Sequence, residues 1–398
     1  MKKIIVCILS IALLFCGCVP TQEKNKSEPV NALYVKSVWM SYYELGDITS
    51  NCDSSKDFEK AIKTAFKKIK SFGLNTVTVQ VRPCADAFYK SNYFPTSKYC
   101  FGIEGCDLKY DPLKIMVDVA HKMGLRIEAW LNPYRVSQSS KIDELSENNL
   151  AKKWYYSDDK KSNVFVDEKI YFNPASTEVN ELIVSGVKEI VNNYTIDAIH
   201  FDDYFYPTKN KKIDELEYSA YLDNGGKLSL DSWRRENVSN MVKSVYSAIK
   251  EINPSVQFGI SPQSKISTDY NDLYADVERW ATEDGYVDYI CPQIYFGFHN
   301  EIQPFTKTVK KWSDFALKSK LYVGLALYKS GKEDKFASED KEHAINEFVD
   351  NSDIISRQIN YLYQIENVTG FYIFSYNYLI DEKNDTLTKE VENIKNVI

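Results

Sequence analysis

Eight times along this chain, a short apolar run typical of a β-strand is followed by a stretch with helical periodicity. The strand-like runs cover residues 34–41, 75–82, 126–132, 198–203, 256–261, 287–295, 321–327 and 371–376. Helical periodicity is clearest in residues 58–72, 178–194 and 241–252. Alternating strands and helices predict a parallel sheet of the α/β class, and a count of eight predicts a closed (β/α)8 TIM barrel.

The two longest connections follow the third and fourth strand-like runs. They cover residues 133–172 and 204–232, and each comes directly after a predicted strand. Loops that follow the strands of such a barrel lie at the face where barrel enzymes keep their active sites. Because no linker interrupts the pattern after residue 31, we expect a single barrel domain over residues 34–398.

Three of the predicted strands have one apolar and one polar face. The polar faces carry Gln80 and Arg82 in the first, Glu128, Trp130 and Asn132 in the second, and His200 and Asp202 in the third. The apolar faces must meet the helices, so the polar faces are expected to point into the barrel. Buried polar side chains need partners, and such a network commonly supports a reactive site. The alternative is a polar core that satisfies itself and has no chemical role.

The segment 198–207 carries the most specific chemical signal. An apolar strand runs into Asp202 and Asp203, and Tyr204, Phe205 and Tyr206 follow at once. Carboxylates surrounded by aromatic rings suit a site that cleaves a glycosidic bond while flat rings hold the sugar. The alternative is an ordinary strand end with solvated acids.

Strand alternation places Asp202 inward at the mouth of the barrel and Asp203 toward a neighbouring loop or helix. Asp202 is therefore the first choice for a catalytic carboxylate, although a structural salt bridge to Arg82 is an alternative role. Glycoside hydrolysis generally needs a second carboxyl group. Asp203, Asp86 and Glu128 are the candidates, and the sequence does not choose among them. Because Glu128 lies one layer deeper, it is expected to support the site by tuning the pKa of its neighbours.

Polar and aromatic residues near the same strand ends are expected to bind the substrate. The candidates are Gln80, Arg82, Trp130, Asn132, Tyr134, Arg135, His200, Tyr204, Tyr206, Gln293 and Tyr295. Among these, the aromatic side chains could form platforms for sugar rings, and Gln293 could donate hydrogen bonds.

Charge and cysteine content exclude several classes of function. A net charge of −7 gives no electrostatic reason to expect a nucleic-acid partner. No spacing of Cys and His resembles a zinc site, and the chain has only 4 His, so we expect neither a metal nor another cofactor. Cys100 and Cys106 flank a loop and could pair in an oxidising exterior, but the scattered cysteines do not form a disulfide framework.

The first 18 residues are expected to be a signal peptide. Two lysines precede an apolar stretch at residues 4–15, which is too short for a permanent membrane span. The run Leu14-Phe15-Cys16-Gly17-Cys18 resembles a bacterial lipobox, which makes Cys18 the expected site of lipidation. Residues 19–33 would then be a polar tether, and the protein would be anchored at the extracytoplasmic face of the cell membrane. The alternative is simple cleavage and release.

Nine ordered blocks of this sequence resemble glycosyl-hydrolase-like family 10. They are QVRPCADAFY (80–89), YDPL (110–113), AWLNPYR (129–135), IHFDDYFYP (199–207), SWRRENV (232–238), FGISP (258–262), LYADVERW (273–280), DYICPQIY (288–295) and LYVGLALYK (321–329). The resemblance implies a secreted or lipid-anchored TIM barrel with glycosidase activity, linked to peptidoglycan strands that lack stem peptides. The chain departs from the family pattern at Gln263-Ser264-Lys265-Ile266 and at Glu128, where a histidine is expected.

The leading hypothesis is a lipid-anchored glycoside hydrolase that acts on cell-wall glycan. A non-catalytic glycan-binding lipoprotein on the same barrel is the main alternative from another class. A glycosidase that acts on another extracellular polysaccharide differs from the leading hypothesis in substrate alone. The ionised acid pair separates the enzyme from the binding protein, because only catalysis requires it.

Overall fold

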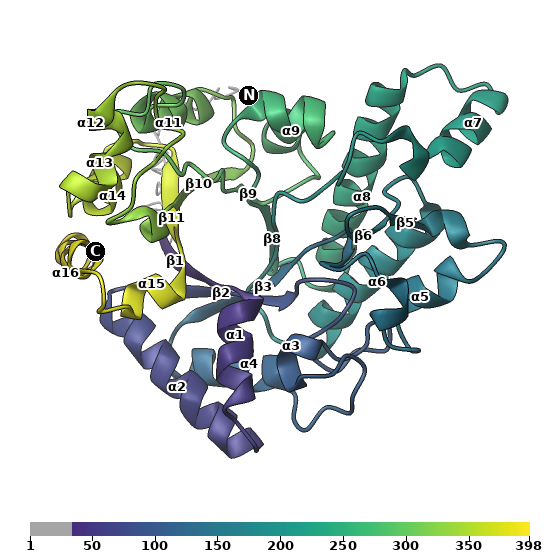
Figure 1. Ribbon diagram of the computed structural model, residues 1–398, viewed down its shortest axis with the longest axis horizontal. Helices are drawn as coiled ribbons and strands as arrows, with labels where there is room; N and C mark the ends of the chain where they lie inside the picture. Colours follow the sequence, from purple (N-terminus) through teal and green to yellow (C-terminus); the bar gives the residue numbers. More distant parts are fainter. Residues whose placement is uncertain (1–33) are drawn as a thin grey trace, which may run out of the picture. The chain divides into compact units, whose positions relative to one another are not determined.

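Eight parallel strands close into a barrel in the computed structural model, which describes residues 34–398 (Figure 1). Around the barrel the order is β1-β11-β10-β9-β8-β7-β3-β2, and β2 pairs with β1 again. The barrel strands are β1 Val35–Met40, β2 Thr76–Arg82, β3 Arg126–Leu131, β7 Ala198–Phe201, β8 Gln257–Ile260, β9 Tyr289–Ile290, β10 Lys320–Leu325 and β11 Val368–Phe374. The predicted (β/α)8 TIM barrel is therefore confirmed.

A ring of helices covers the outside of the barrel: seven lie between successive barrel strands, and the eighth, α16, follows the last strand. These helices are α2 Ser55–Ser71, α4 Pro112–Lys122, α6 Thr177–Asn193, α8 Leu230–Ile252, α10 Val277–Thr282, α11 Phe305–Ser313, α14 Ile354–Leu362 and α16 Asp385–Val397. In α2, the side chain of Ser54 caps the first turn by accepting a hydrogen bond from the Asp57 backbone nitrogen. The face of α2 that includes Phe58, Ile62 and Phe66 is fully buried, as the periodicity predicts.

The long connection after β3 contains a small antiparallel sheet that the sequence analysis did not predict. Its strands are β4 Arg135–Ser137, β6 Ile170–Phe172 and β5 Val164–Val166, paired in that order. Strands of three residues are too short to produce a recognisable alternation of polar and apolar positions. This sheet matters for the site because β4 begins with Arg135.

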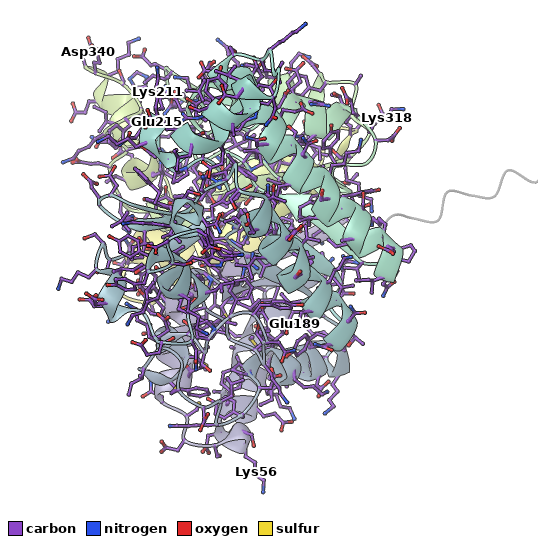
Figure 2. The ribbon with its side chains drawn as sticks, turned by 90° about the vertical axis from the view of Figure 1, so that its right-hand side faces the viewer. Lys56, Glu189, Lys211, Glu215, Lys318 and Asp340 are labelled. Carbon is purple, nitrogen blue, oxygen red and sulfur yellow. The ribbon has the colours of Figure 1, made fainter. Side chains whose placement is uncertain are left out.

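Shorter elements fill the remaining connections, mostly after the strands. They are α1 Tyr42–Ser50, α3 Lys98–Phe101, α5 Leu150–Tyr155, α7 Glu215–Asp223, α9 Ile266–Asp272, α12 Glu342–Ile345, α13 Glu347–Asp350 and α15 Tyr376–Ile380, with 3₁₀ helices at Ile142–Glu144, Lys161–Asn163, Lys211–Ile213 and Leu327–Lys329. Figure 2 shows Lys211 and Asp340, from loops that follow strands, at one end of the barrel and Lys318, which precedes β10, at the other. The long connections thus decorate the carboxyl ends of the strands.

The closure between the first and last strands is reinforced at the mouth of the barrel. Glu44 in α1 accepts hydrogen bonds from the Ser41 backbone nitrogen at 2.5 Å and from the Ser375 hydroxyl and Asn377 backbone nitrogen at 2.7 Å each. One buried carboxylate therefore joins the connection after β1 to the connection after β11.

Cys100 and Cys106 are both free thiols, so the pairing that the sequence allowed is not present. Cys18 and the expected signal peptide and tether lie outside the described residues. Among residues 34–398, no helix is long and apolar enough to cross a membrane.

Candidate active site

A cavity of about 340 Å³ opens at the carboxyl ends of the barrel strands. Eight of the predicted site residues line it: Gln80, Trp130, Arg135, Asp202, Asp203, Tyr204, Gln293 and Tyr295. A second cavity of about 280 Å³ adjoins the first and shares Asp203, Gln293 and Tyr295 with it. The two acids that follow β7 therefore lie where the sequence placed the chemistry.

Asp202 is held by donors from two chain segments. The Trp130 indole nitrogen donates to Oδ2 at 3.1 Å, the Asn132 amide donates to Oδ1 at 3.0 Å, and the Tyr204 backbone nitrogen donates to Oδ1 at 3.3 Å. Burial raises the pKa of Asp202 to about 6, while the charge of Arg135 opposes the rise. Asp202 is therefore a fixed carboxyl group that titrates close to neutral pH.

Asp203 lines both cavities, so the expectation that it turns away from the mouth is wrong. The strand ends at Phe201, and its alternation does not extend to the second acid. Burial raises the pKa of Asp203, and the nearby polar side chains of Gln293 and Gln263 oppose the rise. Asp203 is thus the second carboxyl group of the first cavity, and it lies where the first cavity meets the second.

Asp269 in α9 is a third acid near this site, and the sequence analysis did not single it out. Its Oδ1 accepts a hydrogen bond from the Gln263 backbone nitrogen at 3.2 Å, and its buried Oδ2 has no partner among the described residues. Burial, followed by the charge of Asp203, raises the pKa of Asp269 to about 9. Asp269 therefore keeps its proton at neutral pH. No signal in the sequence distinguishes this acid from the solvated acids of other loops.

Arg135 and Tyr204 complete a group that we call the rim cluster, defined as Asp202, Asp203, Arg135 and Tyr204. The Arg135 guanidinium carbon lies 5.2 Å from the centre of the Tyr204 ring. Tyr204 is 53% exposed, which leaves most of its ring free to meet a ligand. All four residues line the first cavity.

Beneath the rim lies a group that we call the floor cluster, defined as Glu128, His200, Tyr289 and Tyr372. The Glu128 carboxylate accepts hydrogen bonds from Tyr289 at 3.1 Å and from Tyr372 at 2.9 Å. It also accepts one from the Thr78 hydroxyl at 2.9 Å. These partners come from opposite walls of the barrel, so Glu128 and His200 lie inside it, as strand alternation predicts.

His200 connects the floor cluster to the mouth. The Trp39 indole nitrogen donates to Nε2 at 3.2 Å, so the proton of the neutral ring belongs on Nδ1, which lies 2.8 Å from the Tyr289 hydroxyl. Tyr289 in turn donates to Glu128. Burial lowers the pKa of His200 to about 3, so the imidazole stays neutral at physiological pH.

Arg82 does not point into the barrel, and the prediction for it is wrong. The pairing of β2 with β3 shifts register between Gln80 and Arg82, which turns the side chain outward. There the guanidinium lies 4.6 Å from the Phe94 ring centre and close to Gly186 of α6. Its terminal nitrogens have no hydrogen-bond partner among residues 34–398, so the alternative role of Asp202 as a clamp for Arg82 is also wrong.

Three other candidates lie outside the cavity. Tyr206 donates to Asp214 at 2.8 Å, beside the buried ion pair of Asp214 with Arg234 at 2.7 Å. Tyr134 is buried, and its hydroxyl approaches Asn180. Asp86 is also buried, and burial raises its pKa to about 7, but it does not line the cavity. Asn132 and His200 do not line the cavity, but they contact residues that do: Asn132 donates to Asp202, and His200 accepts from Trp39.

The structure adds several lining residues that the sequence analysis did not select: Trp39, Ser41, Tyr42, Tyr43, Ser261 and Phe374. Trp39 and Phe374 come near the ends of predicted strands, so the alternation that identified Trp130 could have identified them. Tyr42 and Tyr43 begin α1, and no strand pattern could place them. In residues 34–398, no three Cys, His, Asp or Glu side chains gather closely enough to hold a metal ion.

Comparisons with known proteins agree with this geometry. Residues 35–342 match the sequence model of the family described as Glycosyl hydrolase-like 10. Glycosyl hydrolase YngK of Bacillus subtilis is 37% identical over 66% of this chain, and the match spans about half (54%) of that relative. Glycosyl hydrolase DigH of Escherichia coli is 28% identical over 94% of this chain and 92% of its own length.

A solved structure shares the fold at much lower sequence similarity. The glycoside hydrolase domain of PgaB (BpsB) from Bordetella bronchiseptica superposes with a TM-score of 0.59 at 9% identity. The superposition covers 91% of this chain and 98% of that domain. At this level of identity, the likeness supports the barrel fold alone.

Proposed function

The chain belongs to the glycosyl hydrolase-like 10 family and is a glycoside hydrolase, and from this premise we propose that it cleaves peptidoglycan strands that lack stem peptides. One observation carries the chemical part of the proposal. Asp202 and Asp203, which are neighbours in sequence, both line a cavity surrounded by aromatic side chains. Such a cavity can hold sugar rings against flat apolar surfaces while two carboxyl groups face the bond to be cleaved.

The two acids can divide the work because their pKa values are raised to different extents. Burial raises both, and the charge of Asp203 raises the pKa of Asp202 further. Over a range of pH the pair therefore carries one negative charge and one proton. Cleavage of a glycosidic bond uses this combination: a protonated acid donates to the leaving oxygen, and a carboxylate stabilises or attacks the anomeric carbon or activates water.

The proposed place of action is the extracytoplasmic face of the cell membrane, with Cys18 as the lipidated residue. The sequence Cys16-Gly17-Cys18 after an apolar stretch supports this anchor. Replacing Cys18 with Ser should move the protein from the membrane fraction to the soluble fraction. Membrane retention of the variant would contradict the anchor without affecting the proposed reaction.

The deciding experiment for the substrate is digestion of purified peptidoglycan with and without amidase pretreatment. We expect soluble glycan fragments after amidase has removed the stem peptides, and few or none from untreated material. Cleavage of another extracellular polysaccharide, with no fragments from either peptidoglycan sample, would replace the substrate in the proposal. Binding to stem-free strands with no cleavage would favour the non-catalytic alternative.

A further inference from the structure

Arg135 is a nearly buried cation that forms no ion pair within the part of the chain that the structure describes. Its side chain lines the first cavity, and the residue is 8% exposed. The Nε atom donates to the Pro83 carbonyl oxygen at 2.8 Å. Among the described residues, no carboxylate oxygen lies within 4.0 Å of the guanidinium. Buried arginines are almost always paired, so this one is incomplete as it stands.

The neighbours of Arg135 orient the guanidinium without neutralising it. The rings of Tyr42 and Tyr204 have their centres 6.0 and 5.2 Å from its central carbon. The Cys84 thiol also lies beside it, but burial raises the pKa of Cys84 to about 12, so this group is neutral. Aromatic rings on two sides hold a planar cation so that its terminal nitrogens can meet a planar anion.

The acids of the cavity do not fill this role. Asp202 already accepts hydrogen bonds from Trp130, Asn132 and the Tyr204 backbone nitrogen. Asp203 lies beside the side chains of Gln293 and Gln263, and no salt bridge joins it to Arg135 among the described residues. Both acids act on Arg135 only through longer-range attraction, which leaves its terminal nitrogens without a carboxylate partner among residues 34–398.

We infer that Arg135 determines specificity by binding a carboxylate of the glycan, on a sugar next to the bond that is cleaved. A carboxylate matches the fork of the guanidinium with two parallel hydrogen bonds, as a neutral hydroxyl cannot. This inference rests on the proposed function. In peptidoglycan, the lactyl carboxylate of the muramyl sugar is blocked by an amide bond when a stem peptide is attached and is free when the peptide is absent. Arg135 would thereby distinguish the two states of the strand.

The test compares two tetrasaccharides that share a backbone and differ in this group. One is the stem-free peptidoglycan tetrasaccharide, and the other is chitotetraose, which has no lactyl carboxylate. Binding of each is measured by titration calorimetry on the full chain, for the native protein and for Arg135→Gln, Arg135→Lys and Lys318→Gln. Lys318→Gln removes a positive charge at the opposite end of the barrel (Figure 2) and controls for net charge.

We expect the native protein and Lys318→Gln to prefer the stem-free tetrasaccharide. Arg135→Gln should lose about 10- to 100-fold in affinity for it and less than about 3-fold for chitotetraose, as expected for removing a charge-assisted pair. Arg135→Lys should retain part of the preference for the stem-free tetrasaccharide, because it keeps the positive charge but loses the two parallel NH donors of the guanidinium.

An equal loss for both sugars in Arg135→Gln, or no preference in the native protein, would overturn the inference. An equal loss for both sugars would mean that Arg135 serves only to balance the charge of Asp202 and Asp203. The absence of a preference in the native protein would mean that the site does not recognise the lactyl carboxylate. Failure of the proposed function is a separate outcome: the native protein would bind the stem-free sugar through Arg135 and yet release no fragments from peptidoglycan. Thermal midpoints of the variants verify that each is folded.

Discussion

The floor cluster and the rim cluster are built from the same barrel and differ in how completely their polar groups are satisfied. In the floor, three hydroxyl groups meet the Glu128 carboxylate, and the ring of His200 has partners at both nitrogens. In the rim, Arg135 has no carboxylate partner among the residues described, and Tyr204 is largely exposed. A network in which every polar group has a partner holds its side chains in one arrangement. A network with an unpaired group can be completed by a ligand. This difference separates the residues expected to position the site from those expected to react or bind.

The largest expected effect comes from Asp202→Asn in the rim. The amide keeps the volume of the acid but can neither protonate the leaving oxygen nor attack carbon, so kcat should fall by about 100- to 10,000-fold. The thermal midpoint should fall only modestly, because the Asn oxygen still accepts hydrogen bonds on one side, while its NH2 group faces the donor that met the other carboxylate oxygen. Both quantities are measured on stem-free peptidoglycan, with Asp203→Asn as the matched variant. Normal turnover by Asp202→Asn would remove this residue from the chemistry.

The second-largest expected effect is a loss of stability in Glu128→Ala, a substitution in the floor cluster. Glu128→Ala leaves the hydroxyl groups of Thr78, Tyr289 and Tyr372 without their acceptor inside the barrel. Since each unsatisfied buried group costs about 1–3 kcal/mol, the free energy of unfolding should fall by about 3 kcal/mol or more. Glu128→Gln, which retains an acceptor, should lose less. Denaturant unfolding measures the difference.

Activity per folded molecule of Glu128→Gln provides the critical contrast. It should remain within about 10-fold of the native value if the floor only positions the site. A loss as large as that of Asp202→Asn, with stability intact, would erase the distinction between floor and rim.

The smallest expected effect comes from Asp269→Asn, at a residue that is buried like the floor and incompletely satisfied like the rim. Burial raises the pKa of Asp269 to about 9, against about 3.9 in an unfolded chain. Between these values the folded state retains a proton that the unfolded state releases, so native stability falls as pH rises. Asn does not ionise and escapes this loss.

The thermal midpoint of Asp269→Asn minus that of the native protein should therefore increase by about 2 °C or more as pH rises from about 5 to about 8. Midpoints measured across this range test the sign. A constant difference between variant and native protein would show that Asp269 does not retain its proton.

Strand alternation predicted the inward direction of Glu128 and His200 because it depends on local geometry alone, but it did not single out Tyr289 and Tyr372, the other members of the floor cluster. Glu128 and His200 lie inside the barrel as their positions predict, since their strands are regular. Arg82 does not lie inside, because a register shift between Gln80 and Arg82 turns its side chain outward. The sequence of polar and apolar residues does not reveal this shift. All four residues of the rim cluster were among the predicted site residues and line the cavity, although the direction predicted for Asp203 was wrong. Tyr206 and Asp269, which lie outside that cluster, are placed by contacts between distant loops, and a single sequence does not encode those contacts as a pattern.

The parallel arrangement of the barrel strands also fixes the direction in which the molecule presents its cavity. Strand β1 begins at Val35, at the end of the barrel opposite the mouth. The described chain therefore enters the barrel at the end opposite the cavity, and the loops that follow the strands surround the opening. Substitutions in those loops can change which ligands the cavity admits, whereas substitutions at the start of β1 do not touch it.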